Sequence, residues 1–280
     1  MNTTADMLID VLQDLTAFAR AIRTDVLHMV HRAKSSHIGS CFSIAEILAV
    51  LYGRILNVDP MRPYKHDRDR FILSKGHACA ALYSALATRG FFPRDWLDEF
   101  YQDGSNLPGH AAHTVPGVEV STGSLGHGLS IACGMALVGK RESEPFRVFT
   151  LLSDGECDEG SVWEAILFAG HHRLNNLVAI VDANKIQSLG RVNEVLNLEP
   201  LCEKWRACRW SVREIDGHNV RELETTLANV PFEPEAPTCV IAKTVKGRGV
   251  SFMQDELLWH YRSPNDQEFA DALSELKAAV

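Results

Sequence analysis

Two residues with oxygen-bearing side chains, Asp154 and Asn184, each come shortly after an apolar run. The runs, residues 149–152 and 177–181, have the composition of buried β-strands and flank a helical stretch. If they are parallel strands joined by a right-handed crossover, the two polar residues emerge at the carboxyl edge of one sheet, where open α/β sheets bind ligands. A carboxylate and a carboxamide oxygen at this edge are predicted to hold one divalent cation.

A cation at this edge predicts an anionic ligand beside it. Mg²⁺ takes about six oxygen ligands at roughly 2.0–2.1 Å and is commonly held by one or two protein groups together with phosphates. Gly155 lets the backbone approach an anion closely, and a helix predicted to start near Glu159 directs its positive end to the same place. We therefore expect a metal-bound diphosphate.

These residues resemble the signature of thiamine diphosphate enzymes, a Gly-Asp-Gly sequence followed by Asn some thirty residues later. Here Asp154 and Gly155 precede Asn184 at that spacing. Ser153 stands where the family more often has glycine, and serine also tolerates a tight turn.

The elements that must position these residues alternate along the chain between strands and helices. The alternation indicates an α/β fold, with a mainly parallel sheet flanked by helices on both faces, in a single domain over residues 1–280. A long amphipathic helix is predicted from residue 8 to residue 30, and Ser43 with Glu46 resembles a capping box before a helix over 44–56. Further strands are predicted at 71–73, 210–215 and 238–244, and further helices at 78–88, 131–138, 198–208, 220–230 and 265–279.

The composition is that of a soluble globular protein, with 46% hydrophobic and 23% charged residues among 280, enough for a substantial core. The formal net charge of −8 argues against nucleic acid or an anionic membrane as the main partner, because such partners select basic patches. Residues 120–139 are uncharged, but their glycines and serines favour a glycine-rich loop and a buried helix over a membrane span.

The seven cysteines are scattered without Cys-x-x-Cys spacing. This pattern predicts reduced thiols and a cytoplasmic location, in place of a disulfide framework or a zinc site. Asp6, Asp10 and Asp14 interrupt the apolar pattern of the N-terminus, so we expect no signal peptide.

Histidines and glycines recur together in several loops. His37, His77 and His110 each lie close to a glycine, and His260 follows another loop, which favours a shared functional site. The run 122–128 has the order Gly-x-x-Gly-x-Gly with no strand before it, so we interpret it as the wall of a cofactor site and not as a dinucleotide fingerprint. We interpret four other histidines as solvated surface residues: His113, His171, His172 and His218.

The loops also resemble those of the cofactor-binding half of transketolase, in the same order and at similar spacing, over essentially the full chain. A whole transketolase is more than twice as long and continues into a pyrimidine-binding domain and a C-terminal domain. The chain therefore resembles the N-terminal subunit of a split transketolase. The matching loops are 35–39, 74–77, 108–110 and 122–128, together with His260.

By this resemblance, the chain contributes the metal and diphosphate sites of a thiamine diphosphate enzyme. Asp154, Asn184 and the backbone carbonyl of Ile186 would bind Mg²⁺. The thiazolium end of the cofactor would lie along Leu125. The diphosphate would be held by His77, Gly123, Gly155 and His260.

The resemblance also implies a set of catalytic histidines, namely His77 together with three that line the substrate channel. His37, His110 and His260 would hydrogen-bond the sugar hydroxyls and the developing alkoxide. Near the subunit interface, Glu159 beside the cofactor site and Glu164 would belong to a chain of carboxylates that links paired active sites. Alternatively, these two are a helix-terminal carboxylate stabilised by the macrodipole and an ordinary surface charge.

The implied activity is the transfer of a two-carbon ketol group from a ketose, such as a ketose phosphate, to an aldose. Thiamine diphosphate carries the chemistry, and the protein supplies orientation and charge. The glutamate that activates the cofactor belongs to the missing pyrimidine-binding domain. The expected partner is therefore a C-terminal transketolase subunit, in an α2β2 heterotetramer. We expect this chain alone to bind the diphosphate weakly and to turn nothing over.

Two other functions remain open at this point. One is an α-type subunit of a 2-oxo acid dehydrogenase, which the histidine-rich loops disfavour because those histidines suit sugar hydroxyls. The other is a non-catalytic cofactor-binding homologue, which the complete set of proposed ligands disfavours. The sequence does not identify the sugar or its distal group.

Overall fold

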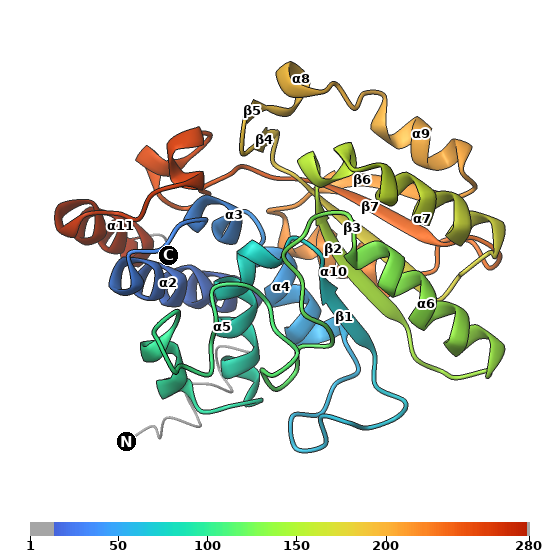
Figure 1. The fold of residues 1–280 in the computed structure, drawn as a ribbon, viewed down its shortest axis with the longest axis horizontal. Helices are drawn as coiled ribbons and strands as arrows, with labels where there is room; N and C mark the ends of the chain where they lie inside the picture. Colours follow the sequence, from blue (N-terminus) through green and yellow to red (C-terminus); the bar gives the residue numbers. More distant parts are fainter. Residues whose placement is uncertain (1–13, 279–280) are drawn as a thin grey trace.

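The computed structural model describes residues 14–278, so the predicted first turns of the N-terminal helix lie outside the described part. One sheet has the strand order β1-β2-β3-β7-β6 with every neighbouring pair parallel (Figure 1), which confirms the predicted α/β class. A short antiparallel pair, β4 with β5, follows β3. The strands are β1 (Arg70–Leu73), β2 (Val148–Ser153), β3 (Leu177–Ala183), β4 (Ile186–Gln187), β5 (Gly190–Arg191), β6 (Ser211–Asp216) and β7 (Thr238–Lys243).

The helices that accompany the sheet include several predicted ones with shifted ends. Within the described residues, none is both long and apolar enough to cross a membrane. Their bounds are α2 (Leu15–Ala33), α3 (Ile38–Phe42), α4 (Ala45–Val50), α5 (Cys79–Arg89), α6 (Gly128–Arg141), α7 (Gly160–His171), α8 (Val192–Val195), α9 (Leu201–Ala207), α10 (Val220–Ala228) and α11 (Asp266–Ala278).

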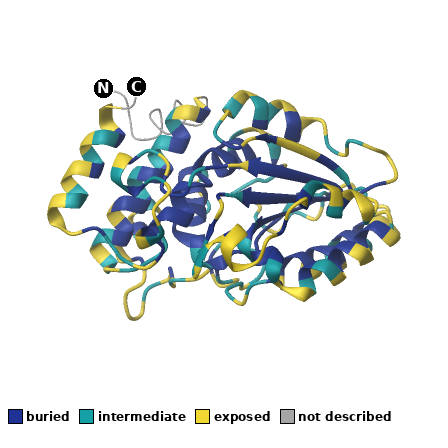
Figure 2. Ribbon diagram, turned by 90° about the horizontal axis from the view of Figure 1, so that it is seen from above, coloured by how far each residue is buried: buried dark blue, intermediate teal, exposed yellow. Residues whose placement is uncertain are grey.

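Helices cover both faces of the sheet, and each face has its own apolar core. Residues of α2, α4, α5 and α10 pack in one core, and residues of α6, α7 and α9 pack in the other. Within β2, Phe149 and Leu151 enter the first core while Val148 and Leu152 enter the second, because side chains along a strand point alternately to opposite faces. Figure 2 shows the buried strands between the outward, exposed faces of the helices.

The ends of β2 and β3 meet at the carboxyl edge of the sheet. Their parallel register pairs Ser153 with Asp182, and the backbone N–H of Asp154 donates to the carbonyl of Asp182 over 3.2 Å. Asp154 and Asn184 therefore emerge at the same edge, as the crossover rule predicts. Their role as metal ligands stays a prediction.

The predicted capping box is wrong. Ile44, and not Ser43, is the N-cap residue of α4, and it makes no side-chain cap hydrogen bond. The Ser43 hydroxyl instead donates to Oδ2 of Asp182 over 2.7 Å. Glu46 forms an ion pair with Arg23 of α2, so tertiary partners take both side chains that the local pattern assigned to the helix end.

Candidate functional site

The predicted site residues converge on one cavity of about 200 Å³ at the carboxyl edge of the sheet. Its walls come from segments far apart in the sequence: the start of α3, the loops after β1 and before α6, the tips of β2 and β3, and the segment after β7 (Figure 1). Every candidate except Glu159 and Glu164 lines this cavity. The lining candidates are His37, His77, His110, Gly123, Leu125, Asp154, Gly155, Asn184, Ile186 and His260.

Glu159 and Glu164 are both exposed on the described chain. Glu159 is the N-cap residue of α7, without a side-chain cap hydrogen bond, and it is not part of the cavity lining. Its position agrees with the interpretation as a helix-terminal carboxylate, stabilised by the helix dipole. Glu164 lies farther along α7, on its exposed side.

Asp154 is buried with its carboxylate held in place by two backbone donors. Oδ1 accepts from the N–H of Gly155 over 2.8 Å, and Oδ2 accepts from the N–H of Lys185 over 2.6 Å. Burial, together with the nearby Asp182 carboxylate, raises the pKa of Asp154 to about 6. A carboxylate whose charge is disfavoured in this way is suited to a bound cation, which would offset the cost of burial.

Asn184 presents its side-chain oxygen in a fixed orientation. Its Nδ2 donates to Oδ2 of Asp182 over 2.7 Å, so Oδ1 must face the other way, where it accepts from the N–H of Ile186 over 3.1 Å. Because a carbonyl or carboxylate oxygen can accept more than one hydrogen bond or ligate a cation as well, the oxygens of Asp154 and Asn184 fit the preference of a hard cation.

Lys246 also lines the cavity, and no sequence pattern assigned it a role. Its Nζ donates to the carbonyl of Ile186 over 2.8 Å and lies 2.8 Å from Nδ1 of His260. The side chain is 1% exposed. Burial, and then the neighbouring ammonium of Lys75, lower the pKa of Lys246 to about 8. A buried cation beside the predicted metal ligands fits an anionic ligand such as a diphosphate.

The histidines form a cluster in the cavity. The ring of His37 lies 4.9 Å from that of His77, 6.1 Å from that of His110 and 5.1 Å from that of His260. Burial and neighbouring basic groups lower the pKa of His37 to about 4 and that of His260 to about 3, and they hold the pKa of His77 well below its usual value. Without a bound anion these three imidazoles are neutral near pH 7, so each can donate one hydrogen bond and accept another.

A buried ion pair contacts Asn184, one of the predicted metal ligands. Nζ of Lys75 donates to Oδ2 of Asp182 over 2.6 Å, and both side chains are fully buried. Asp182 also accepts from Ser43 and Thr244 in addition to Asn184. This carboxylate therefore joins the tips of β3, α3 and the segment after β7 into one rigid support.

Glu156 fixes the glycine-rich loop against β2. One carboxylate oxygen accepts from the N–H of Gly126 over 2.9 Å and from the hydroxyl of Ser74, and the other accepts from the N–H of Ser153 over 3.2 Å. Gly126 has a φ of 82°, in the region that favours glycine. No local sequence pattern singles out Glu156, because two of its partners come from other loops.

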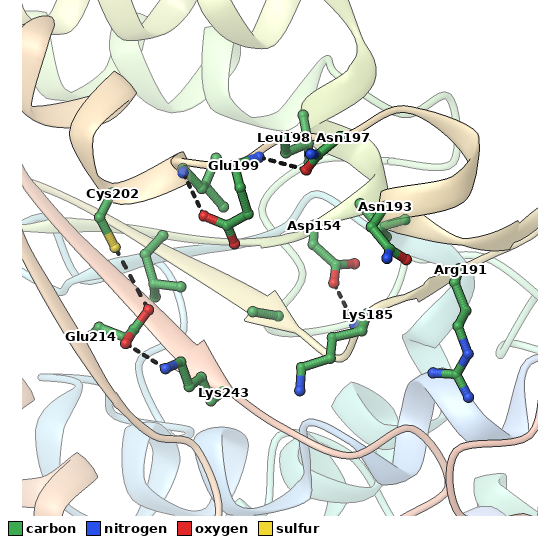
Figure 3. A pocket seen from close by; sticks show the side chains of 14 residues that line it. Asp154, Lys185, Arg191, Asn193, Asn197, Leu198, Glu199, Cys202, Glu214 and Lys243 are labelled. Atoms are coloured by element: carbon green, nitrogen blue, oxygen red, sulfur yellow. Dashed lines mark hydrogen bonds and ion pairs between the residues drawn. The ribbon is translucent and has the colours of Figure 1, made fainter.

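Asp154 also lines a second cavity, of about 340 Å³ (Figure 3). Its walls include Lys185, Lys243 and Glu214, and the last two form an ion pair. Figure 3 shows the hydrogen bond from Lys185 to the Asp154 carboxylate at the boundary of this space. Asp154 thus lines two cavities, and of these two only the smaller is lined by the histidines.

His218 corrects one interpretation drawn from the sequence. Its side chain is only 9% exposed and contacts Glu46, so it is not a solvated surface histidine. His113 and His171 are exposed and His172 is partly exposed.

Comparison with known proteins defines the class of this fold and site. Residues 15–276 match the family of the transketolase thiamine diphosphate binding domain, so the chain belongs to this family. Its members use thiamine diphosphate with a divalent metal such as Mg²⁺, in agreement with the predicted cofactors. The fold agrees as well: transketolase from Leishmania mexicana superposes with a TM-score of 0.90 at 29% identity, over 94% of this chain and 41% of that one.

Two bacterial relatives match over nearly their whole length. The 6-deoxy-6-sulfo-D-fructose transketolase subunit of Clostridium sp. (strain MSTE9) is 40% identical, over 94% of this chain and 96% of the relative. One of the subunits of apulose-4-phosphate transketolase from Phocaeicola vulgatus is 38% identical, over 92% of both chains. Transketolase of Rattus norvegicus is 39% identical, but the chain covers only 40% of its length. The chain therefore spans about two fifths of longer transketolases and nearly all of these subunits.

Proposed function

We propose that this chain is the N-terminal subunit of a two-chain transketolase, which transfers a two-carbon ketol group from a ketose to an aldose. The observation that carries the proposal is the convergence of Asp154, Asn184 and four histidines on one cavity. The match to relatives named as transketolase subunits, over nearly their full length, supports it.

In this proposal the tips of β2 and β3 hold Mg²⁺. Asp154 and Asn184 supply side-chain oxygens, and the carbonyl of Ile186 supplies a third. One carboxylate neutralises only half of the charge of a divalent cation, and the other half is left for a phosphate group. Lys246 donates to the Ile186 carbonyl, so we expect its ammonium to become available to the diphosphate when the metal takes this oxygen.

The remaining residues bind and orient the cofactor and the sugar. His77, Gly123, Gly155 and His260 line the part of the cavity assigned to the diphosphate, with Leu125 for the thiazolium. Thiamine diphosphate supplies the carbon nucleophile that takes up the ketol group. The neutral imidazoles of His37 and His260 would donate to sugar oxygens and hold a proton at the oxygen where charge develops, and we assign the same role to His110.

Metal affinity is expected to depend on pH through Asp154. Its pKa is about 6 in the metal-free chain, and only the carboxylate form can ligate a cation. Affinity should therefore be constant above pH 6 and fall by about 10-fold for each pH unit below it. Mn²⁺ can be used as a paramagnetic probe without the diphosphate, so that phosphate protonation does not contribute. A flat profile from about pH 5 to about pH 7 would argue against Asp154 as a ligand.

Exposed apolar side chains on α6 and α7 support a multi-chain assembly. Val138 is 58% exposed, and Leu167 and Phe168 are 60% and 39% exposed. A Cβ added to Gly134 of α6 would meet no atom within 4 Å, so this side of α6 is open to close approach. We propose that α6 and α7 contact other chains of the α2β2 assembly, near Glu164.

All seven cysteines are free thiols, which supports the expected cytoplasmic location.

The test is to assay the chain alone, the partner alone and the mixture. The partner is the C-terminal subunit that carries the pyrimidine-binding domain and the activating glutamate. We expect ketol transfer only in the mixture, with thiamine diphosphate and Mg²⁺ present. Activity of the mixture on pyruvate, with none on any ketose, would favour the 2-oxo acid dehydrogenase subunit instead.

The donor panel should include a ketose phosphate, a ketose sulfonate and an unsubstituted ketose. Because two relatives are named for 6-deoxy-6-sulfo-D-fructose and apulose-4-phosphate, we include both sugars among the donors to be tested. A thermal-shift titration with thiamine diphosphate and Mg²⁺ tests whether the chain is a non-catalytic homologue. Binding of the cofactor to the native state raises the apparent stability of the protein. No shift with or without the partner would favour a non-catalytic scaffold.

A further inference from the structure

We propose that His218 is a positioning residue for the cofactor cavity, which acts through the backbone of Val245 to fix Lys246. This inference rests on the proposed function, since it concerns how the chain holds the diphosphate. His218 lies outside the cavity lining. Its side chain is 9% exposed, in the turn before α10.

The hydrogen bonds of the imidazole determine which nitrogen carries the proton. The backbone N–H of Val245 donates to Nε2 over 2.8 Å, so Nε2 must present a lone pair. A neutral imidazole then carries its hydrogen on Nδ1. Nδ1 lies 3.0 Å from Oε2 of Glu46, which accepts that hydrogen. His218 thus links a backbone donor to a carboxylate.

Glu46 is held in place by Arg23 of α2. The guanidinium donates to both carboxylate oxygens, over 2.7 Å and 2.6 Å, and also to the carbonyl of Phe42 over 2.9 Å. Although burial raises the pKa of Glu46, Arg23 and His218 lower it, and the net pKa is about 2. The carboxylate therefore stays charged, and the imidazole has a fixed acceptor on the side away from Val245.

The backbone of His218 is fixed as well. Its N–H donates to Oδ1 of Asp216 over 2.9 Å, and the next residue, Asn219, caps α10 by accepting from the N–H of Glu222. The ring therefore has little freedom to follow a displacement of Val245. Nε2 of His218 is therefore a fixed acceptor for the N–H of Val245, and it restrains the segment that follows β7.

Val245 directly precedes Lys246, whose side chain reaches the Ile186 carbonyl and His260. On the other side of Lys246, the N–H of Gly247 donates to the carbonyl of Gly39 over 3.1 Å. The lysine is thus held between two backbone anchors, one from His218 and one from α3. Loss of the first would leave the part-buried N–H of Val245 without its acceptor and free the backbone on one side of the ammonium.

Two substitutions separate the two hydrogen bonds of the ring. In His218→Gln the longer side chain can place a carbonyl oxygen near the former Nε2, which keeps an acceptor for Val245. In His218→Asn the shorter side chain can place an amide donor near the former Nδ1, which keeps the contact with Glu46 but not the one with Val245. A structural role at Glu46 alone would favour the asparagine variant, whereas positioning through Val245 favours glutamine.

The readouts are hydrogen exchange at the Val245 amide in the ligand-free chain and calorimetric affinity for thiamine diphosphate with Mg²⁺ in the complex with the partner subunit. We expect His218→Asn to speed exchange and weaken affinity by about 10-fold, the lower end of what loss of a supporting partner costs a metal site. His218→Gln should restore most of both. His66→Asn, at a histidine 76% exposed, is the matched control and should change neither.

Unchanged affinity in His218→Asn, or an equal loss in both variants, would overturn the proposal. If wild-type protein binds no thiamine diphosphate, the proposed function fails, while exchange at Val245 still tests the anchor. If His218→Asn does not fold, the ¹⁵N chemical shifts of His218 in the wild-type chain decide. The Nδ1–H tautomer is expected, and the Nε2–H tautomer would overturn the proposal because it cannot accept from Val245.

Discussion

Replacement of Asp154 by alanine is expected to abolish Mg²⁺-dependent binding of thiamine diphosphate. The carboxylate is the only charged group among the three proposed metal ligands, so its loss should cost more than the roughly 10- to 100-fold that loss of an outer-shell partner costs. Calorimetry with the complex of both subunits measures the effect. Retained Mg²⁺-dependent affinity would contradict the metal assignment.

The fold of this variant should survive, which makes the result interpretable. Burial and the Asp182 carboxylate raise the pKa of Asp154, so its charge destabilises the native chain above the ordinary carboxyl pKa, and removing it does not cost a favourable ion pair. Asp154→Asn keeps the shape and should also lose affinity. Asp271→Asn, on the exposed side of α11, removes the same charge far from the site and should bind normally.

Replacement of Asp182 by asparagine is expected to lower the free energy of unfolding by about 3–5 kcal/mol, the cost of breaking a buried ion pair from one side. Lys75 and Asp182 are both fully buried and 2.6 Å apart, so the variant leaves an ammonium buried without a counter-charge. Denaturation by urea, monitored in the ligand-free chain, measures the loss.

The double variant Lys75→Met with Asp182→Asn provides the control for this prediction. It removes both charges, and replacement of a whole buried pair is often neutral or stabilising. It should recover more than half of the lost stability. If the double variant is no more stable than Asp182→Asn, then the hydrogen bonds from Ser43 and Thr244 matter more than the ion pair.

Part of the site follows from local patterns. The apolar runs before Asp154 and Asn184 predicted two parallel strands, and the register of β2 with β3 brings both residues to one edge. The loops that resemble those of transketolase predicted a shared site for His37, His77 and His110, and these three residues line one cavity. The first prediction succeeded because it depends on strand period and on where parallel strands end, which the chain expresses locally, whereas the second rests on the resemblance of the loops.

Other parts had no local signal, because their partners are distant in the sequence. Lys75 and Asp182 are 107 residues apart, and Glu46 and His218 are 172 residues apart. The capping box at Ser43 failed for the same reason: the local pattern was present, but a buried carboxylate from β3 offered the hydroxyl a different partner.

The sequence by itself determined the class of the fold, the edge at which the site lies and the candidates for metal and cofactor binding. Periodic burial of apolar residues decides the fold class and the edge, and it can be read along the chain, whereas the cofactor-binding candidates were implied by the resemblance of the loops to transketolase. Only the tertiary structure decided which polar groups hold those candidates in place, such as Glu156, Lys246 and His218. A buried polar group takes whichever partner the fold brings within hydrogen-bond distance, and that choice has no imprint on neighbouring residues.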